Sequence, residues 1–441
     1  MMNWNSRSLA AVWHPCTQMK GHEEIPLLAI KRGKGAFLYD HQDKAYLDSI
    51  SSWWTNLFGH ANPSINQAIT DQLNELEHVM LAGMTHEPAI LLSEQLSALT
   101  HNNLGHAFYG SDGASAVEIA LKMSFHYWRN LGKIKKTQFV CLANSYHGET
   151  LGALSVTDIP IFSDTYSELL RSKILAPSPD LRLIQEHQSE EEFTLQTILK
   201  LEEILSAQHS TIAALIIEPM VQCATGMAMH SSTYLKSVRV LCDKYQILLI
   251  ADEIAVGFGR TGTFFACEHA DIWPDLMTLS KGLTGGYLPL SVVLSRDKIY
   301  QAFYSNQTSH GFLHSHSYTG NPLACRSALA TLELFKTLGT LQQNCILARQ
   351  LRRAFDWAQA DSRLEHFRQL GTILAFDVKK DLATPYFSKL FFAKALEKGL
   401  LIRPIGNTVY VMPPYILTEQ DCVFLGLTVQ ICLDEILRLT K

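Results

Sequence analysis

The sequence lacks several features that would place it in common classes of protein. None of its nine cysteines stands in a C-x-x-C pair, and no repeat or low-complexity run is present. No stretch approaches the roughly 18 consecutive apolar residues of a membrane-spanning helix. Basic residues are not in excess, because Lys and Arg total 37 against 42 Asp and Glu. These absences argue against a disulfide scaffold, a membrane protein and a nucleic-acid-binding protein.

The first twenty residues also lack the apolar segment and small-residue cleavage site of a secretory signal. Widely scattered cysteines in odd number are typical of reduced thiols. We therefore expect a cytoplasmic protein that binds small molecules, with no nucleic-acid or membrane partner.

An α/β fold is predicted by what the sequence does contain. Hydrophobic residues make up 47% and charged residues 18% of the 441 residues, as in ordinary globular proteins. Short β-rich runs alternate with amphipathic stretches such as 115–131 and 232–245, a pattern that favours βαβ units and a mostly parallel sheet. The expected strands are residues 138–142, 213–217, 248–251, 276–279 and 291–294.

The strongest candidate for a functional residue is Asp252, in LLIADEIAVGFGRTG. It ends a predicted buried strand, and ligands of open α/β sheets bind beyond the carboxyl ends of strands. A carboxylate there can bind the protonated nitrogen of a pyridine ring and keep that ring electron-withdrawing. For this segment alone, an acid that caps the next helix or faces solvent at a strand end is the alternative.

Lys281, in TLSKGLTGGYLP, follows another short apolar run and is flanked by small residues. A lysine that forms a Schiff base must be partly desolvated, so that its neutral form is available near pH 7. Most lysines are solvated surface charges, but a lysine directly after a buried strand favours the chemical role. Asp252 and Lys281 together therefore indicate a pyridoxal-type site.

Three further segments could complete such a site. In FYGSDGASAVEIALKM, Gly113 and Ala114 open a predicted helix whose N-terminus could hold a phosphate, although an ordinary helix cap explains the same residues. Tyr146 follows another strand and could stack on a cofactor ring. Ser317, in LHSHSYTGNPLAC, could donate a hydroxyl to a phosphate. The neighbouring histidines (His310, His314 and His316) lack the carboxylates or cysteines that would complete a metal site, so we expect no metal.

Taken together, the motifs resemble those of the class III (fold type I) pyridoxal-phosphate-dependent aminotransferases along essentially the whole chain. The segments that carry the resemblance are WHPCTQM (13–19), SSWW (51–54), THEPAI (85–90), IADEIAVGFGRTG (250–262), SKGLTGG (280–286) and GNPLAC (320–325). Within the family they are similar to the branch that converts 8-amino-7-oxononanoate to 7,8-diaminononanoate in biotin biosynthesis. Either S-adenosylmethionine or L-lysine would be the amino donor.

The resemblance implies a role for each matching position. Lys281, Asp252 and Tyr146 would be catalytic and would bind pyridoxal 5'-phosphate. The phosphate would lie against the turn at Gly113 and Ala114, with the Ser317 hydroxyl supplied by the neighbouring subunit of a homodimer whose active site lies at the interface, and His316 would also bind the cofactor. The substrate-binding residues would be Trp53, Trp54, Tyr146, Arg260, Lys281, Ser315 and Arg403.

More specific roles follow for two arginines. Arg403 would bind the carboxylate of the keto substrate, and Arg260 would lie near the amino donor. The chain departs from many relatives at Cys16, where they have Tyr, and at Ser315 and His316, where they have a Gly-Pro pair.

The resemblance also implies a division into domains. A large cofactor-binding domain would span residues 65–328, and residues 1–64 and 329–441 would together form a smaller α+β domain. Two hairpin-like pieces, GAFLYDHQDKAYLDS and LLIRPIGNTVYVMPP, and a predicted helix over 341–361 belong to that smaller domain.

Other functions are possible on the sequence alone. Another class III transaminase, acting on ω-amines, is the main alternative, although the SSWW and WHPC segments argue against it. A non-catalytic binding protein would not need both Lys281 and Asp252. A dinucleotide-dependent dehydrogenase is disfavoured because the glycines of GFGRTG do not form the G-x-G-x-x-G turn that opens a helix.

Overall fold

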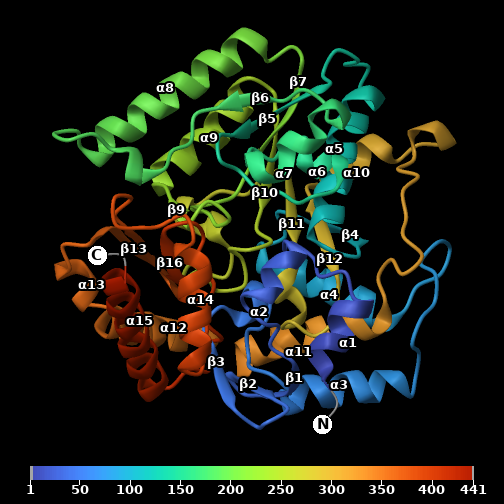
Figure 1. The fold of residues 1–441 in the computed structure, drawn as a ribbon. Helices are drawn as coiled ribbons and strands as arrows, with labels where there is room; N and C mark the ends of the chain where they lie inside the picture. Colours follow the sequence, from blue (N-terminus) through green and yellow to red (C-terminus); the bar gives the residue numbers. More distant parts are fainter. Residues whose placement is uncertain (1–2, 440–441) are drawn as a thin grey trace.

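The computed structural model describes residues 3–439 and places a seven-stranded sheet at the centre of the molecule (Figure 1). Across the sheet the strands are β4 (His106–Gly110), β12 (Ser291–Ser295), β11 (Leu276–Leu279), β10 (Leu248–Asp252), β7 (Ile212–Ile217), β5 (Gln138–Leu142) and β6 (Ile174–Ala176). Strand β12 is antiparallel to β11 and to β4, and the other neighbouring strands run parallel. The mostly parallel sheet expected from the sequence is therefore confirmed.

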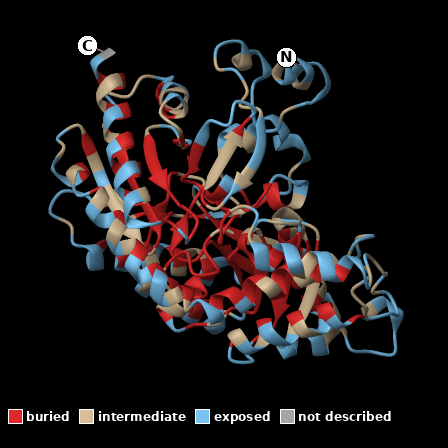
Figure 2. Ribbon diagram, turned by 90° about the horizontal axis from the view of Figure 1, so that it is seen from below, coloured by how far each residue is buried: buried red, intermediate tan, exposed pale blue. Residues whose placement is uncertain are grey.

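The central strands are apolar throughout because both faces of this sheet are covered. Successive residues of one strand point to opposite faces, so Leu249 and Ile250 of β10 lie in two different hydrophobic clusters. Helix α5 (Gly113–Asn130) contributes Val117 and Ala120 to the cluster on one face, and α9 (Ser232–Lys244) packs in the other. Buried residues accordingly fill the middle of the molecule (Figure 2).

Eight further helices belong to the chain before residue 340. They are α1 (Trp4–Ala11), α3 (Pro63–Leu73), α4 (Glu87–Leu99), α6 (Leu151–Leu154), α7 (Pro160–Ser163), α8 (Glu190–Gln208), α10 (Asp297–Phe303) and α11 (Pro322–Thr337). Helix α8 begins with a capping box in which Ser189 and Glu192 each bond the other's backbone N–H. Helix α11 packs against α3 and α4 and so ties the region after residue 320 to the N-terminal third.

A second sheet joins segments from the two ends of the sequence. Its strands are β1 (Ile30–Lys34), β2 (Phe37–Asp40), β3 (Ala45–Asp48) and β15 (Leu400–Leu401), in that order. Leu400 pairs with Leu47 and Leu401 pairs with Asp48, in parallel. The first of the two predicted hairpins, β2 with β3, is confirmed.

The C-terminal part of the chain adds a three-stranded antiparallel sheet covered by helices, which lies beside the N-terminal strands (Figure 1). Its elements are α12 (Thr340–Ala354), α13 (Trp357–Ala360), β13 (Leu364–Leu370), β14 (Ile373–Val378), α14 (Phe387–Glu397), β16 (Thr408–Val411) and α15 (Glu419–Leu439). A small hairpin, β8 (Val221–Gln222) with β9 (Ala228–Met229), completes the strands. The boundaries at residues 64 and 328 stay predictions, and residues 1, 2, 440 and 441 lie outside the described chain.

Two expectations for the C-terminal part were wrong. Residues 400–414 do not form one hairpin, because β15 pairs with β3 whereas β16 pairs with β14. Pro404, which lacks an N–H, separates the two strands, and the free edge of β3 takes β15. The helix expected over 341–361 ends at Ala354, and a separate turn, α13, follows.

Among residues 3–439, no helix is both long enough and apolar enough to cross a membrane.

Candidate active site

Three neighbouring strands of the large sheet deliver polar side chains to one edge. Ile217 of β7 pairs with Ala251 of β10, so the next residues, Glu218 and Asp252, follow side by side. Asp252 in turn pairs with Thr278 of β11, three residues before Lys281. The carboxyl ends of parallel strands are where such sheets bind ligands. We call Glu218, Asp252 and Lys281, with His147, the floor of the site.

Asp252 is held by three donors. His147 Nδ1 lies 2.7 Å from Oδ2, and both the Thr278 hydroxyl and the Ile254 backbone N–H lie 3.2 Å from Oδ1. The His147 ring is buried, and its other nitrogen, Nε2, is a buried atom without a hydrogen-bond partner among the described residues. A histidine that donates one N–H to a carboxylate fixes the orientation of that carboxylate.

Lys281 is the cationic member of the floor. Burial lowers the pKa of its ammonium group, and the negative charge of Asp252 opposes this effect without cancelling it. Its backbone has a φ of +43°, a left-handed conformation that is uncommon for a lysine. The Nζ atom lies 4.9 Å from the centre of the Trp54 ring. The lysine is thus partly desolvated, as its predicted role requires.

Glu218 was not singled out from the sequence, although it follows an apolar strand just as Asp252 does. Its carboxylate accepts hydrogen bonds from the backbone N–H of Tyr146 (3.1 Å) and of Cys223 (3.2 Å). Burial, with a smaller contribution from the charge of Asp252, raises the pKa of Glu218 to about 7. Because a charged group is costly in this setting, the floor carries a carboxyl group that can be neutral near physiological pH.

Tyr146 is linked to two acids. Its backbone N–H binds Glu218, and its hydroxyl donates to Glu149 at 2.9 Å. Burial and the charge of Glu149 raise the pKa of the Tyr146 phenol, so it stays a neutral hydrogen-bond donor. Glu149 is a second residue that the sequence did not reveal, since an exposed acid after a strand has no distinctive pattern.

The segment Ser51–Trp54, α2, presents two tryptophans to the site, and we call it the tryptophan turn. The guanidinium carbon of Arg403 lies 5.2 Å from the centre of the Trp53 ring, while Trp54 lies over Lys281 and donates its indole N–H to the Tyr410 hydroxyl at 3.2 Å. Trp53 is 47% exposed and Trp54 is 5% exposed. The structure therefore brings the predicted substrate residues Trp53, Trp54 and Arg403 together beside the floor.

All four residues of the tryptophan turn have left-handed backbones, with φ of 51°, 46°, 73° and 71° in chain order, and none is a glycine. A left-handed helical conformation costs an L-residue roughly 1–2 kcal/mol. Such a run persists only where surrounding contacts hold it, and its presence beside a candidate site is a physical sign of function.

Arg260 is almost completely buried, and its guanidinium lies 4.9 Å from the centre of the Tyr415 ring. Among the described residues, its hydrogen bonds go only to backbone carbonyls. Its guanidinium donates to Pro413 (2.6 Å) and Met412 (3.4 Å), and to Trp54 (3.3 Å) and Asn56 (3.4 Å). Burial lowers the pKa of Arg260. It therefore supports the loops beneath the tryptophan turn, and its contact with an amino donor stays a prediction.

The predicted phosphate turn is built at the start of α5. Asp112 caps the helix by accepting the N–H of Ser115 at 2.8 Å, which supports the cap that was the alternative explanation, while Gly113 and Ala114 form the first helical positions. Gly148 lies directly against this turn, because a Cβ atom there would be 2.6 Å from that of Ala114. The close approach brings the Tyr146 loop onto the helix N-terminus.

Ser315, His316 and Ser317 lie on the connection before α11. Ser315 and Ser317 are exposed, and among residues 3–439 neither has a hydrogen bond to the floor. His316 Nδ1 lies 2.8 Å from the Ser111 hydroxyl, and His314 Nδ1 lies 2.7 Å from Lys122 Nζ. The described residues contain no group of three potential metal ligands. The histidines here serve local hydrogen bonds.

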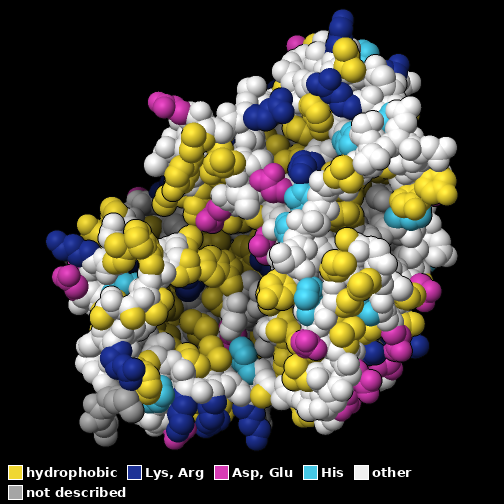
Figure 3. Space-filling model, turned by 90° about the vertical axis from the view of Figure 1, so that its right-hand side faces the viewer, with side chains coloured by type: hydrophobic (Ala, Val, Ile, Leu, Met, Phe, Trp, Pro, Cys, Tyr) yellow, Lys and Arg dark blue, Asp and Glu magenta, His cyan; other side chains and the backbone are white. Residues whose placement is uncertain are grey.

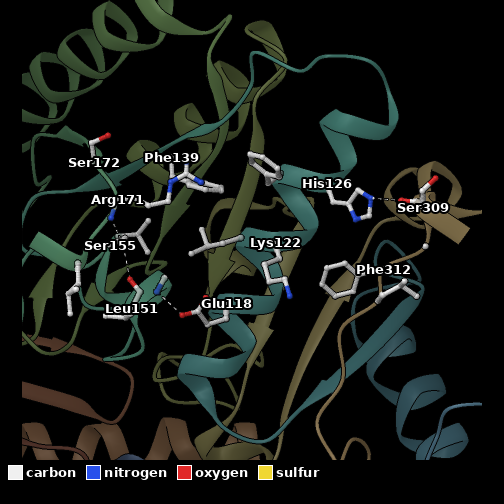
Figure 4. Close-up of a pocket in the computed structure, with 17 residues that line it drawn as sticks. Glu118, Lys122, His126, Phe139, Leu151, Ser155, Arg171, Ser172, Ser309 and Phe312 are labelled. Atoms are coloured by element: carbon white, nitrogen blue, oxygen red, sulfur yellow. Dashed lines mark hydrogen bonds between the residues drawn. The ribbon is translucent and has the colours of Figure 1, made fainter. Parts of the chain in front are cut away.

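A cavity of about 630 Å³ lies elsewhere, between α5, β5 and residues 309–313 (Figure 4). Glu118 accepts the Gly152 N–H within it, and Phe139 and Phe312 contribute apolar walls. None of the floor residues lines this cavity.

Figure 3 shows the side of the molecule that lies on the right in Figure 1, where apolar side chains gather in hollowed parts of the surface.

Comparison with known proteins assigns this arrangement to a family. Residues 17–427 match the model of the class-III aminotransferases. The chain belongs to that family. The expected resemblance is thereby confirmed, and the family depends on pyridoxal 5'-phosphate.

Individual relatives agree with this membership. The chain is 44% identical over 426 residues, 95% of each chain, to a Helicobacter pylori protein named adenosylmethionine-8-amino-7-oxononanoate aminotransferase. It is similar to the crystal structure of the Methanocaldococcus jannaschii protein of the same name, with a TM-score of 0.92, 32% identity and 98% coverage of both chains. An amine transaminase of an uncultivated Pseudomonas species, solved in its PLP-bound form, gives a TM-score of 0.91 at 30% identity, covering 96% of this chain and 98% of that one.

Proposed function

We propose that this chain is a pyridoxal-phosphate-dependent aminotransferase that converts 8-amino-7-oxononanoate to 7,8-diaminononanoate in biotin biosynthesis. The observation that carries the proposal is the floor, with Lys281 beside Asp252, next to the Trp53–Arg403 pair. The 44% identity to the Helicobacter pylori relative supports the choice of substrate. The scattered free cysteines favour a cytoplasmic location.

The residues present fit pyridoxal 5'-phosphate. Lys281 offers an amine whose pKa is lowered by burial, Asp252 offers a carboxylate for a ring nitrogen, and Gly113 with Ala114 offers a helix N-terminus for a phosphate. The buried, unpartnered His147 Nε2 adds a polar atom at the same place. When bound, the cofactor supplies an electron-withdrawing ring that stabilises negative charge at the substrate carbon.

Each of the site residues then has a separate role. Lys281 Nζ would hold the cofactor and, when free, would move a proton to and from the substrate carbon. Asp252, oriented by His147, would hold a proton on the ring nitrogen. Tyr146, kept neutral by its surroundings, would pack against the ring.

Arg403 has the geometry for binding a substrate carboxylate. Its guanidinium is exposed, and among the described residues no carboxylate forms a salt bridge with it. One side of the group is occupied by the Trp53 ring at 5.2 Å, which leaves its N–H edge for a bidentate contact. The keto acid would bind there, with Trp53 against its aliphatic part.

A homodimer is part of the proposal. Ser317 would reach the phosphate of the other subunit, because its side chain is exposed and, among the described residues, has no hydrogen bond to the floor of its own chain. Apolar side chains nearby, including Leu313 (79% exposed) and Tyr318 (66% exposed), favour burial by a second subunit. Sedimentation of the purified protein tests this, and a monomer with full activity would contradict it.

The amino donor can be identified by one experiment. The purified holoenzyme is mixed separately with S-adenosylmethionine and with L-lysine, and the absorbance of the bound cofactor is followed. Conversion by only one of them identifies the donor. Conversion by neither, together with turnover of simple amines and pyruvate, would favour the alternative of an ω-amine transaminase, which the likeness to the Pseudomonas amine transaminase keeps open.

A further inference from the structure

The tryptophan turn has an anchor that the proposed mechanism does not use. Asp48, the last residue of β3, is completely buried. Its Oδ1 accepts the backbone N–H of Ser52 at 2.9 Å, and its Oδ2 accepts the Ser52 hydroxyl at 2.7 Å. One carboxylate thus binds both the backbone and the side chain of a single residue with a φ of 46°.

His60 completes this anchor. Its Nε2 lies 3.0 Å from Asp48 Oδ2, and its Nδ1 lies 3.3 Å from the Asn56 side-chain amide. With Nε2 donating to the carboxylate and Nδ1 accepting from the amide, the ring has one defined orientation. Among the described residues, the Asp48 carboxylate therefore has all its hydrogen bonds within the turn and the residues just after it.

Asp48 also lies next to β15, the strand that leads to Arg403. Leu401 pairs with Asp48 in the parallel β3–β15 pair, and Arg403 follows two residues later. The turn also contacts the C-terminal segment through Ser51, whose hydroxyl donates to the Met412 carbonyl at 2.8 Å, and through Trp54, whose indole N–H donates to the Tyr410 hydroxyl. Asp48 thus binds the turn through its carboxylate and pairs with β15 through its backbone, which links the backbone before Trp53 to the strand before Arg403.

We propose that Asp48 is a positioning residue for substrate binding, which holds Ser52 in its left-handed conformation and so places Trp53 on the Arg403 guanidinium. The inference rests on the proposed function, in which Arg403 binds the carboxylate of the keto acid. Without the anchor, the turn relaxes toward ordinary backbone angles and the indole leaves the guanidinium. The loss falls on substrate binding more than on the proton transfers at Lys281.

Asp48→Asn in the holoenzyme tests the proposal. We expect the KM for 8-amino-7-oxononanoate to rise about tenfold while kcat changes less than about threefold, the pattern of a lost binding contact. Adding Ser52→Gly in the same chain should restore the KM to within about threefold of wild type, because glycine adopts positive φ without strain. Restoration by glycine separates a conformational role of Asp48 from an effect of its charge.

A readout independent of activity uses ¹⁹F NMR of protein labelled with fluorotryptophan. The Trp53 signal is assigned by its disappearance in Trp53→Phe. It should shift in Asp48→Asn and return toward its original position in the double variant. If the wild-type enzyme does not turn over the keto acid, the proposed function fails, while this signal still decides whether Asp48 positions Trp53.

Asp40→Asn is the matched control. Asp40 ends the neighbouring strand β2, is similarly buried, and accepts two backbone N–H groups and the Tyr46 hydroxyl, all at 2.9 Å. Within residues 3–439 no hydrogen bond or ion pair joins Asp40 to the tryptophan turn, so its loss should leave both the KM and the Trp53 signal unchanged.

Two results would overturn the proposal: Asp48→Asn changing the KM and the signal no more than Asp40→Asn does, or the double variant being as impaired as Asp48→Asn. If Asp48→Asn does not fold, Ser52→Ala takes its place, since it removes only the hydroxyl bond. A rise in KM of about threefold with a shifted Trp53 signal then supports the anchor, and wild-type values refute it.

Discussion

The floor of the site and the tryptophan turn lie side by side but differ in how the chain builds them. The floor consists of residues that follow regular, buried strands, and its properties are electrostatic: a lysine whose pKa is lowered by burial and a carboxyl group whose pKa is raised to about 7. The turn consists of four residues in a rare backbone conformation held by hydrogen bonds. The proposed function assigns the proton transfers to the floor and the binding of the keto acid to the turn and Arg403.

If this division is correct, changes in the floor should reduce kcat, whereas changes around the turn should raise KM. The following predictions test that contrast.

Replacement of Lys281 has the largest expected effect. Lys281→Ala removes both the amine that binds the cofactor and the group that moves the proton, so kcat should fall by ~10³-fold or more with the fold unchanged. Steady-state kinetics and far-UV circular dichroism measure the two quantities. Lys200→Ala, at an exposed position on α8, is the control. Near-native activity of Lys281→Ala would refute the assignment.

Asp252→Asn should have the next largest effect. Asn keeps the size of the side chain but cannot hold a positive charge on a ring nitrogen, and a lost charged hydrogen bond corresponds to a decrease in kcat of roughly 100-fold. His147→Ala should produce a smaller decrease in the same parameter, because it only frees the orientation of Asp252. A selective increase in KM in either variant would argue against the role of the floor.

Arg403→Ala tests the substrate side. The KM for the keto acid should rise roughly tenfold, and kcat should change much less, because the guanidinium binds the carboxylate equally in the ground and transition states. Arg403→Lys should recover only part of the affinity, since an ammonium group cannot form the bidentate contact. An unchanged KM in Arg403→Ala would remove Arg403 from the binding site.

Glu218→Gln should have the smallest effect, visible in the pH dependence of stability. The pKa of Glu218 is near 7 in the folded protein and near its ordinary value when unfolded, so between these values the folded state holds the proton more tightly. Raising the pH therefore destabilises the wild-type protein relative to the variant, by roughly 1–3 kcal/mol between pH 5 and 8. Denaturant unfolding of the cofactor-free proteins measures this difference, and parallel pH profiles would contradict it.

The same contrast separates what the sequence predicts from what it does not. Asp252 and Lys281 were predicted because each directly follows a continuous apolar strand, and Glu218 obeys the same rule although it was overlooked. The left-handed angles of Ser51–Trp54 could not be predicted, since they depend on contacts such as that between Ser51 and Met412, 361 residues apart. Arg260 shows the same limit, because its hydrogen bonds go to backbone carbonyls that have no signature in the sequence.

The pairing of β15 with β3 has a consequence for how the protein forms. More than 350 residues separate Leu47 from its partner Leu400, so the cost in chain entropy of closing this contact is met late, after intervening segments have folded. During synthesis, β3 is made early, and the edge that later pairs with β15 stays unpaired until residue 400 has left the ribosome. The substrate side of the site is therefore completed last, and a nascent chain can contain the whole floor before it can recognise a substrate.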